Sequence, residues 1–297
     1  MKVLVTGATG LIGTRVSEAL RDRGDETVAL TRAPRDAGDV GWDPERGQLD
    51  AGALDGVDAV VHLAGRSIGE KKWTPDEKRA VLESRTKGTA LLVSTLASMA
   101  RPPRVLVSAS AIGYYGDRGD EELTEQSGPG EGFLADLCVE WEAAVAPVEE
   151  AGIRTVRVRT GIVLARDGGA LARMLLPFKL GLGGRVGSGK QWMSWIAIDD
   201  EVGAILHALD RDDVRGVCNL VAPNPVRNAE FTTTLGRVLH RPTVLPTPLA
   251  PLKLWFGSEL VQQLLLYSQR VRPTCLLDTG YSFRHTSLAD ALAAVVG

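Results

Sequence analysis

The chain has few cysteines, no long apolar run and no excess of positive charge, and each shortage argues against a class of protein. Cys138, Cys218 and Cys275 stand far apart, which supports neither a disulfide framework nor a zinc site. No stretch approaches the roughly 18 apolar residues that a membrane helix needs, and Met1 leads into a strand rather than a signal peptide. With 34 Lys and Arg against 37 Asp and Glu, and no basic run, nucleic acid is not an expected partner. We expect a cytoplasmic protein without a metal or a membrane partner.

The alternation of short β-branched runs with helical stretches indicates an α/β fold with parallel strands and crossover helices. The 297 residues, 44% of them hydrophobic, suffice for one large domain plus a small one. We therefore predict a doubly wound parallel sheet over residues 1–240, with a less regular substrate-side region after Gly161, and a small helical C-terminal domain over residues 241–297. Strands are expected at 3–5, 27–31, 58–63, 105–107, 153–158 and 192–198, and helices at 11–23, 75–100, 133–150 and 200–210.

A glycine-rich turn, TGATGLIG over residues 6–13, separates the first predicted strand from the first predicted helix. Backbone N–H groups in such a turn, together with the positive end of the helix, bind a pyrophosphate, and glycines allow the phosphate oxygens to approach the main chain. The spacing is GxxGxxG, so its position between strand and helix carries more weight than the glycines alone. This turn predicts dinucleotide binding by Gly7, Thr9, Gly10, Leu11, Ile12 and Gly13.

The end of the second predicted strand indicates which dinucleotide is bound. A fold selective for NAD places an acidic residue there to bind the ribose 2′-hydroxyl, whereas this chain has Thr31 and Arg32. A guanidinium can pair with a 2′-phosphate, and the Thr31 hydroxyl lies beside it. The cofactor is therefore predicted to be NADP(H), with Arg35 as a second candidate cation; the alternative is two solvated arginines in a polar loop.

Several motifs together give a resemblance to the extended and atypical short-chain dehydrogenase/reductase superfamily. Besides the glycine turn they are HLAG at 62–65, SASAIGYYG at 108–116 and WIAIDD at 195–200. RTGIVL at 159–164, GSGKQW at 187–192, APNP at 222–225 and NAEF at 228–231 resemble the epimerase-like subfamily with a small C-terminal domain of unknown function. The resemblance extends over essentially the whole chain and implies a Rossmann-type fold.

The resemblance implies further contacts to the cofactor. Leu63 and Ala64 are expected along the adenosine and ribose, and Val163 beside the nicotinamide. Arg85 stands where extended enzymes usually carry Asn, so it is expected to reach a cofactor or substrate phosphate, or else to be an exposed helix arginine.

The catalytic pair usual in this superfamily is missing. Its tyrosine acts as general acid or base because a lysine one helical turn later lowers the tyrosine pKa, and no YxxxK occurs here. Phe133 and Leu137 occupy the corresponding places. Ser110 and Tyr114 are the remaining catalytic candidates, Ser110 as a hydrogen-bonding partner of the substrate and Tyr114 as a proton donor.

Two kinds of function remain open at this point. One is an NADP(H)-dependent oxidoreductase or epimerase-like enzyme that acts on a small polar substrate; an epimerase would regenerate its own cofactor without net oxidation. The other is a non-catalytic NADP(H)-binding sensor or interaction protein. A cluster at 190–195 together with Trp73 is expected near the substrate cleft; the alternative is that these tryptophans belong to the core. The apolar tail, 249–256 and 260–266, either caps the cleft or forms a homodimer surface.

Overall fold

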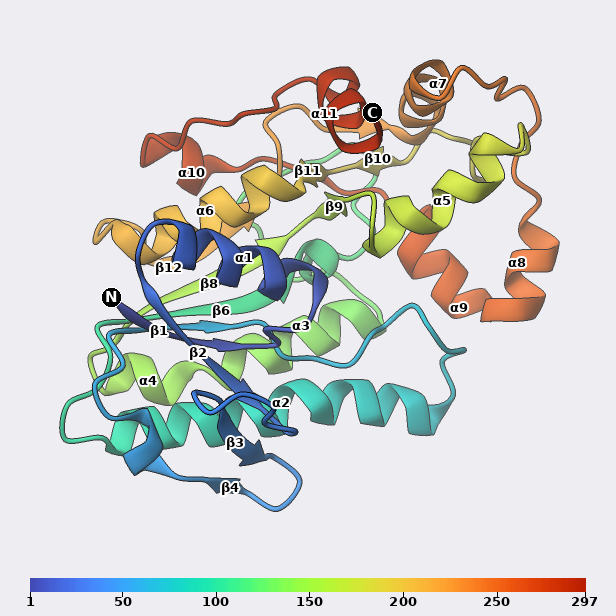
Figure 1. Cartoon of the computed structure of the whole chain (residues 1–297). Helices are drawn as coiled ribbons and strands as arrows, with labels where there is room; N and C mark the ends of the chain where they lie inside the picture. Colours follow the sequence, from blue (N-terminus) through green and yellow to red (C-terminus); the bar gives the residue numbers. More distant parts are fainter.

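A computed structural model describes residues 1–297 and places a mostly parallel sheet at the centre of the molecule (Figure 1). The order of its eight strands is β12-β8-β6-β5-β1-β2-β3-β4, with only β4 antiparallel to its neighbour. Chain order reverses between β1 and β5, which is where ligands bind in doubly wound sheets. The predicted fold class is confirmed. The strands are β1 (Lys2–Thr6), β2 (Glu26–Thr31), β3 (Val40–Asp43), β4 (Gln48–Leu49), β5 (Ala59–His62), β6 (Val105–Ala111), β8 (Arg154–Thr160) and β12 (Gly216–Leu220).

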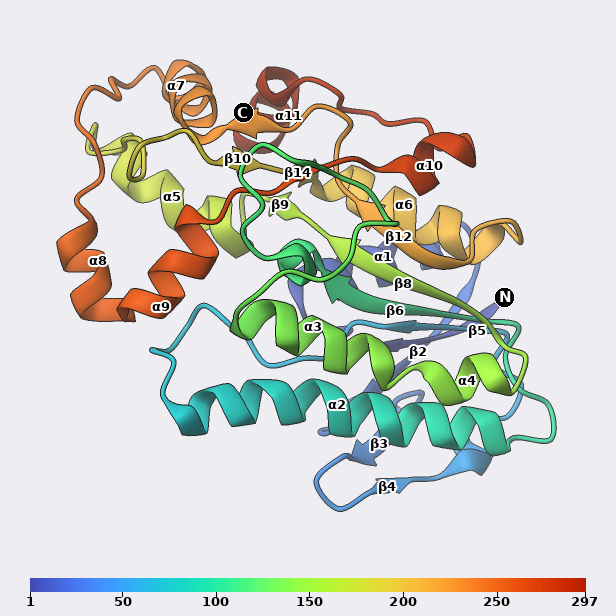
Figure 2. The same ribbon diagram turned by 180° about the vertical axis from the view of Figure 1, so that it is seen from behind.

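Helices cover both faces of this sheet (Figures 1 and 2). One face carries α1 (Leu11–Asp22) and α6 (Ile198–Asp210), whose apolar sides pack on Val3, Val5 and Val107. The other carries α2 (Pro75–Ser98), α3 (Phe133–Ala143) and α4 (Ala146–Glu150). The single helix expected at 133–150 is thus two, because Pro147 begins a new helix at its first turn.

The substrate-side region is built from short strand pairs and helices. These elements are η2 (Ile112–Tyr115), β7 (Glu122–Leu123), β9 (Ile162–Leu164), α5 (Gly169–Lys179), β10 (Trp192–Met193), β11 (Trp195–Ala197), β13 (Val226–Arg227) and α7 (Asn228–Val238). The short helix η1 (Ala51–Leu54) lies instead between β4 and β5 and packs on the face of the sheet that carries α2. The strand expected at 192–198 is interrupted at Ser194, whose hydroxyl donates to the Gln269 carbonyl. The glycine-rich stretch contains the helix α5, which the sequence did not predict because glycines flank it.

The C-terminal segment shares a hydrophobic core with the substrate-side region. Leu288 and Leu292, near the C-terminus, pack in one cluster with Trp195 and Phe231. The remaining elements are α8 (Leu249–Phe256), α9 (Ser258–Val261), η3 (Gln262–Leu266), β14 (Arg270–Val271), α10 (Thr274–Asp278) and α11 (Leu288–Val296). None of the helices combines the length and apolarity that crossing a bilayer requires.

Candidate functional site

The turn between β1 and α1 is tightly folded around three glycines. Gly7 has a φ of +67°, which favours glycine, and its carbonyl accepts a 2.9 Å hydrogen bond from the Gly10 N–H. A Cβ on Gly13 would lie 2.1 Å from the Gly7 carbonyl oxygen. The first turn of α1 therefore approaches the loop more closely than any side chain at Gly13 would permit.

The N-terminus of α1 has none of the groups that usually satisfy a helix start. No side chain caps it, and its first turn contains no acidic residue. By contrast, Thr74 caps α2 by accepting a hydrogen bond from the Glu77 N–H, and Asp76 and Glu77 lie in the first turn of that helix. The free N–H groups and the positive end of the α1 dipole form an anion site at the place predicted for the pyrophosphate.

The carboxyl end of β5 is held against this turn by Thr6. The Thr6 hydroxyl oxygen accepts hydrogen bonds from the backbone N–H groups of Leu63 and Ala64, both at 3.0 Å. A Cβ on Gly7 would lie 3.0 Å from the Leu63 carbonyl carbon. The structure thus brings Leu63 and Ala64 directly beside the glycine turn.

Buried His62 completes this support. Because both lone pairs of the Thr6 hydroxyl are taken, its hydrogen donates to His62 Nδ1 (2.8 Å), and the Nε2–H donates to Thr89 (2.9 Å). Burial lowers the pKa of His62 to about 4, so the ring is neutral at pH 7. His62 therefore fixes the ends of β1 and β5 and adds no charge.

Thr31 and Arg32 lie at the end of β2, next to β1 at the same edge of the sheet. The Thr31 hydroxyl accepts a hydrogen bond from the Ala33 N–H. Arg32 is exposed and forms no ion pair, and no acidic residue stands at this strand end. A free guanidinium at this position can bind a 2′-phosphate.

Arg85, on α2, is a buried cation without a carboxylate partner. Its guanidinium donates to the carbonyls of Arg66 and Val81, while its buried Nε has no hydrogen-bond partner. The group stacks 4.9 Å from the Trp141 ring, and a Cβ on Gly65 would lie 3.2 Å from it. Burial lowers the Arg85 pKa to about 10, which still leaves the group charged at pH 7. An uncompensated buried cation beside Gly65 favours an anionic ligand there.

Val163, in the middle of β9, packs against the same hydrophobic cluster as Ala8 of the glycine turn and Ile12 of α1. The segment after it approaches α1, where the Leu11 side chain is 3.0 Å from a Cβ placed on Gly168 and Arg15 pairs with Asp167 at 2.9 Å. Of the residues predicted to bind the cofactor, the structure thus brings Leu63 and Ala64 to the glycine turn, and it brings the segment after Val163 to the start of α1. Thr9 is exposed at the tip of the turn.

Ser110 belongs to a buried ionic network. It lies opposite Arg159 in the β6–β8 register, and its hydroxyl donates to Glu142 at 2.6 Å. Arg159 binds both oxygens of the same carboxylate at 2.8 Å. Burial opposes the charge on Arg159, but the hydrogen bonds to Glu142 outweigh it, so the pKa of Arg159 is raised. The Ser110 oxygen still has lone pairs with which to accept a hydrogen bond.

Tyr114 and Tyr115 differ in what their hydroxyls do. Tyr115 is fully buried; its hydroxyl donates to Asn219 at 2.7 Å and accepts from Arg159 at 3.0 Å. Burial raises the pKa of Tyr115 to about 12. Tyr114 is only partly buried and its hydroxyl has no partner, while the Arg159 guanidinium lies 3.4 Å from its ring centroid. Of these two tyrosines, Tyr114 is the one with a phenol free to act on a ligand.

The places of the missing tyrosine and lysine are apolar in three dimensions as well. Leu137 is buried in a cluster with Trp73 and Leu260. Phe133 meets the Trp73 ring edge-on at 4.9 Å, with Lys78 5.1 Å above its own ring. Trp73, expected to cover the cleft, is therefore a core residue whose indole N–H donates to the Ile68 carbonyl.

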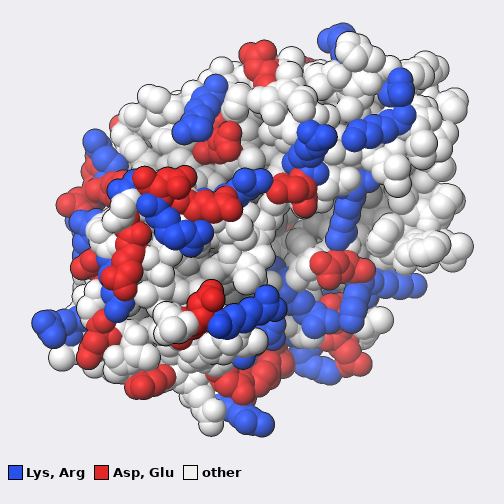
Figure 3. Space-filling model, in the orientation of Figure 1, with Lys and Arg blue, Asp and Glu red and all other residues white.

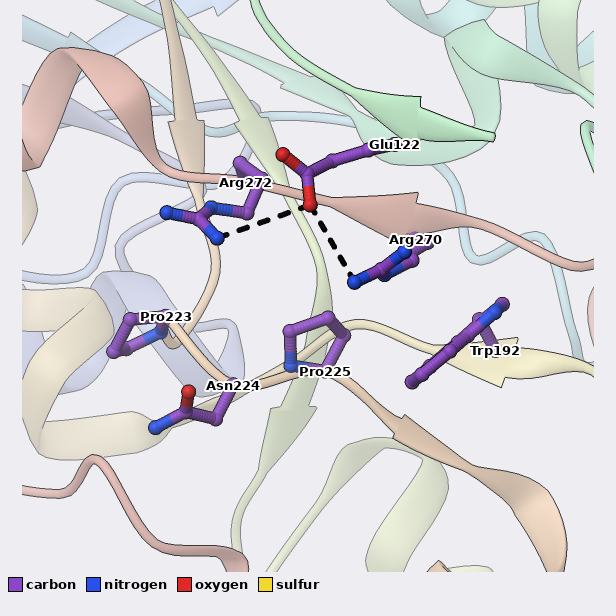
Figure 4. A pocket seen from close by; sticks show the side chains of 7 residues that line it. All are labelled: Glu122, Trp192, Pro223, Asn224, Pro225, Arg270 and Arg272. Carbon is purple, nitrogen blue, oxygen red and sulfur yellow. Dashed lines mark ion pairs between the residues drawn. The ribbon is translucent and has the colours of Figure 1, made fainter. Parts of the chain in front are cut away.

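The residues at 190–195 do not form one surface at the cleft, and the alternative, a core role for the tryptophans, is confirmed for Trp195. Trp195 is fully buried, and the Gln191 amide donates to the Val186 and Leu265 carbonyls. Trp192 lines a separate small cavity of about 150 Å³ (Figure 4). There its ring lies between Arg227 and Arg270, and Glu122 pairs loosely with Arg270 and Arg272.

The C-terminal elements border the site from the side of α3. Gln263 accepts a hydrogen bond from the Leu134 N–H, and Glu259 pairs with Lys78 of α2. Arg173 of α5 donates to the carbonyl of Gly69, in the loop that follows β5, at 2.6 Å. The segment 260–266 thus packs beside the cleft, whereas α8 has no buried residue. In the orientation of Figure 1, basic side chains gather around a hollow in this half of the molecule (Figure 3).

Sequence reasoning missed Glu142 and Arg159 as parts of the site. Helical periodicity does not decide whether Glu142 points toward the sheet or toward solvent. Arg159 stands in the motif RTGIVL at 159–164, which does not by itself indicate a partner. Its place opposite Ser110 on neighbouring strands could have been inferred from register, since β6 and β8 are both predicted strands.

This fold defines an α/β protein of the Rossmann type. Residues 3–220 match the NAD dependent epimerase/dehydratase family, and residues 247–295 match a domain of unknown function, DUF1731. The chain belongs to the NAD dependent epimerase/dehydratase family and carries this C-terminal domain.

Relatives of known sequence and structure agree with this assignment. The chain is 42% identical to epimerase family protein Mb2239 of Mycobacterium bovis, over 98% of this chain and 96% of the relative. It is 40% identical to human epimerase family protein SDR39U1, over the full length of both. A crystal structure of human SDR39U1 with NADPH is similar at a TM-score of 0.92 and 39% identity, covering 99% of each chain.

Proposed function

We propose that this protein binds NADP(H) at the carboxyl edge of its sheet and acts as an oxidoreductase on a small polar carbonyl or hydroxyl compound. The observation that carries the proposal is the uncapped, acid-free start of α1 packed directly on the glycine turn. Unpaired Arg32 at the end of the neighbouring strand supports the phosphorylated cofactor. The NADPH in the similar human structure supports it as well.

When bound, the cofactor supplies or accepts the hydride. The chain's own residues orient the substrate and handle the proton. Tyr114 is the proposed proton donor to a substrate carbonyl, because its hydroxyl is free and Arg159 holds its ring and places positive charge against it. Ser110 donates its own hydrogen to Glu142, so it can accept a hydrogen bond only from a hydroxyl group of the substrate.

The test uses purified protein with NADPH and a panel of small aldehydes and ketones, and with NADP⁺ and a panel of small hydroxy acids, with nicotinamide absorbance as the readout. Tyr114→Phe should lower turnover by about 10²-fold or more without weakening NADPH binding. Tyr281→Phe is the control, because that tyrosine packs against His207 of α6 and its hydroxyl donates to the Asp200 carbonyl, and it should retain turnover. Equal turnover by wild type and Tyr114→Phe would contradict the assigned role.

A second candidate function is favoured by the apolar places of the usual catalytic pair. Leu137 is buried among hydrophobic side chains, which suits a protein that binds NADP(H) without chemistry, as a sensor or interaction protein. Tight NADPH binding without oxidation by any member of the panel would support this second function. An epimerase would instead convert its substrate without net change in absorbance, which product analysis detects.

A further inference from the structure

Two long segments of the chain contain no acidic residue. Residues 168–198 and 231–258 carry seven Lys and Arg but no Asp or Glu, although the whole chain has 37 acidic residues against 34 basic ones. The first segment includes α5 and the second includes α8. Segments that carry only positive charge produce a local positive potential, which attracts anionic partners.

The two segments lie side by side. The Thr247 N–H donates to the Arg185 carbonyl at 2.9 Å, and its hydroxyl donates to the Gly184 carbonyl at 2.8 Å. Arg241 donates to the Lys179 carbonyl at 2.8 Å. Both ribbon views place α5 and α8 along the same end of the molecule, away from the N-terminus (Figures 1 and 2). The acid-free segments therefore form one continuous end of the protein.

This end also holds most of the large hydrophobic side chains that the protein leaves in water. Leu254 and Trp255 of α8 are 85% and 81% exposed, and no residue of that helix is buried. Isolated exposed apolar residues are common, but a group of this size marks an interaction site. We call this surface the basic apolar face; it comprises Leu176, Lys179, Leu180, Leu182, Arg185, Arg241, Val244, Leu245, Lys253, Leu254 and Trp255.

The charges of this face are uncompensated. None of its four cations lies within an ion pair, although ion pairs are frequent elsewhere on the surface. In Figure 3 the outer edge formed by α5 and α8 shows white and blue atoms, while red atoms lie mainly elsewhere. A second copy would place one basic face against another, which like-charge repulsion disfavours. A partner that is both anionic and apolar would match the positive charge and the exposed hydrophobic side chains of this face.

We propose that the basic apolar face docks on the surface of a bilayer containing anionic phospholipid. Trp255 and Leu254 would enter the boundary between headgroups and acyl chains, where tryptophan is favourable. Lys253 and Lys179 would keep their aliphatic stems on the apolar side and their ammonium groups at the lipid phosphates. This is attachment to one leaflet, and it replaces the sequence-based expectation that no membrane is involved.

Flotation of the full-length protein with vesicles tests the proposal. Vesicles of phosphatidylcholine with 30% phosphatidylglycerol should bind the protein, vesicles of phosphatidylcholine alone should not, and added salt should weaken binding. Leu254→Ser/Trp255→Ser should lower partitioning at least tenfold, and Lys179→Gln/Lys253→Gln should lower it by roughly fivefold for each lost charge. Leu277→Ser and Arg101→Gln, exposed residues remote from the face, are the matched controls.

The outcomes separate the possible occupants. NADPH binding by each variant verifies folding, because α8 lies outside the nucleotide site. No binding of wild type to the anionic vesicles would overturn the proposal, as would equal losses in the control variants. A dimer in sedimentation that Trp255→Ser dissociates would assign the face to a second copy. Binding to polyglutamate but not to vesicles would assign it to an acidic protein.

Discussion

The Glu142–Arg159 pair offers a quantitative prediction about stability, because both side chains are almost fully buried. Glu142→Gln keeps the shape of the side chain but removes the charge that Arg159 binds through two 2.8 Å hydrogen bonds. Removing one partner of a buried pair leaves the other charge uncompensated, which costs about 3–5 kcal/mol. With an unfolding entropy of about 2.1 cal/mol/K per residue, a chain of 297 residues should lose roughly 5–8 °C in Tm.

Differential scanning calorimetry of three variants checks this reasoning. Glu140→Gln is the matched control, because Glu140 is exposed on the same helix, and its Tm should stay within about 1 °C of wild type. Glu142→Gln/Arg159→Met removes both charges and should recover part of the loss, since the two effects are coupled. A Tm of Glu142→Gln equal to that of Glu140→Gln would refute the argument that this carboxylate compensates a buried cation.

Three further predictions concern the cofactor and a buried acid. Arg32→Ala should weaken NADPH binding by about 10- to 100-fold and leave NADH binding unchanged; equal wild-type affinities for the two would remove the basis for this preference. Gly13→Ala should abolish binding of both in titrations, because its Cβ would meet the Gly7 carbonyl at 2.1 Å; unimpaired binding would place the nucleotide elsewhere. Burial raises the pKa of Glu201 to about 8 from an ordinary 4.5. Between these two pH values the folded protein therefore binds more protons than the unfolded chain. The free energy of unfolding should accordingly fall as pH rises from about 5 to 8. Tm measured across that range should fall, and Glu201→Gln should flatten the slope; a wild-type Tm that does not fall would show that Glu201 ionises normally.

The parts of the fold that local rules govern were predictable from the sequence. The glycine turn, Thr74 before Pro75, and the β-branched strands each carry their own conformational signal, and the structure places them as expected. The helix α5 was not predictable, because glycines flank it and its stability comes from Leu171, Leu175 and Phe178 packing in the C-terminal core.

The candidate site divides in the same way. The residues around the nucleotide follow strand ends, so their convergence could be inferred from a parallel sheet. The network of Ser110, Glu142 and Arg159 depends on which face of α3 packs against β6 and β8, and that is a tertiary property. The sequence likewise could not show that Trp195 is buried while Trp192 lines a separate cavity.

Calorimetric titration of cofactor-free wild-type protein with NADPH measures directly whether the start of α1 holds a dinucleotide. We expect one saturable site per chain, with no measurable heat for Gly13→Ala under the same conditions. Absence of heat for wild type with both NADPH and NADP⁺ would contradict it, because the start of α1 would then bind no dinucleotide.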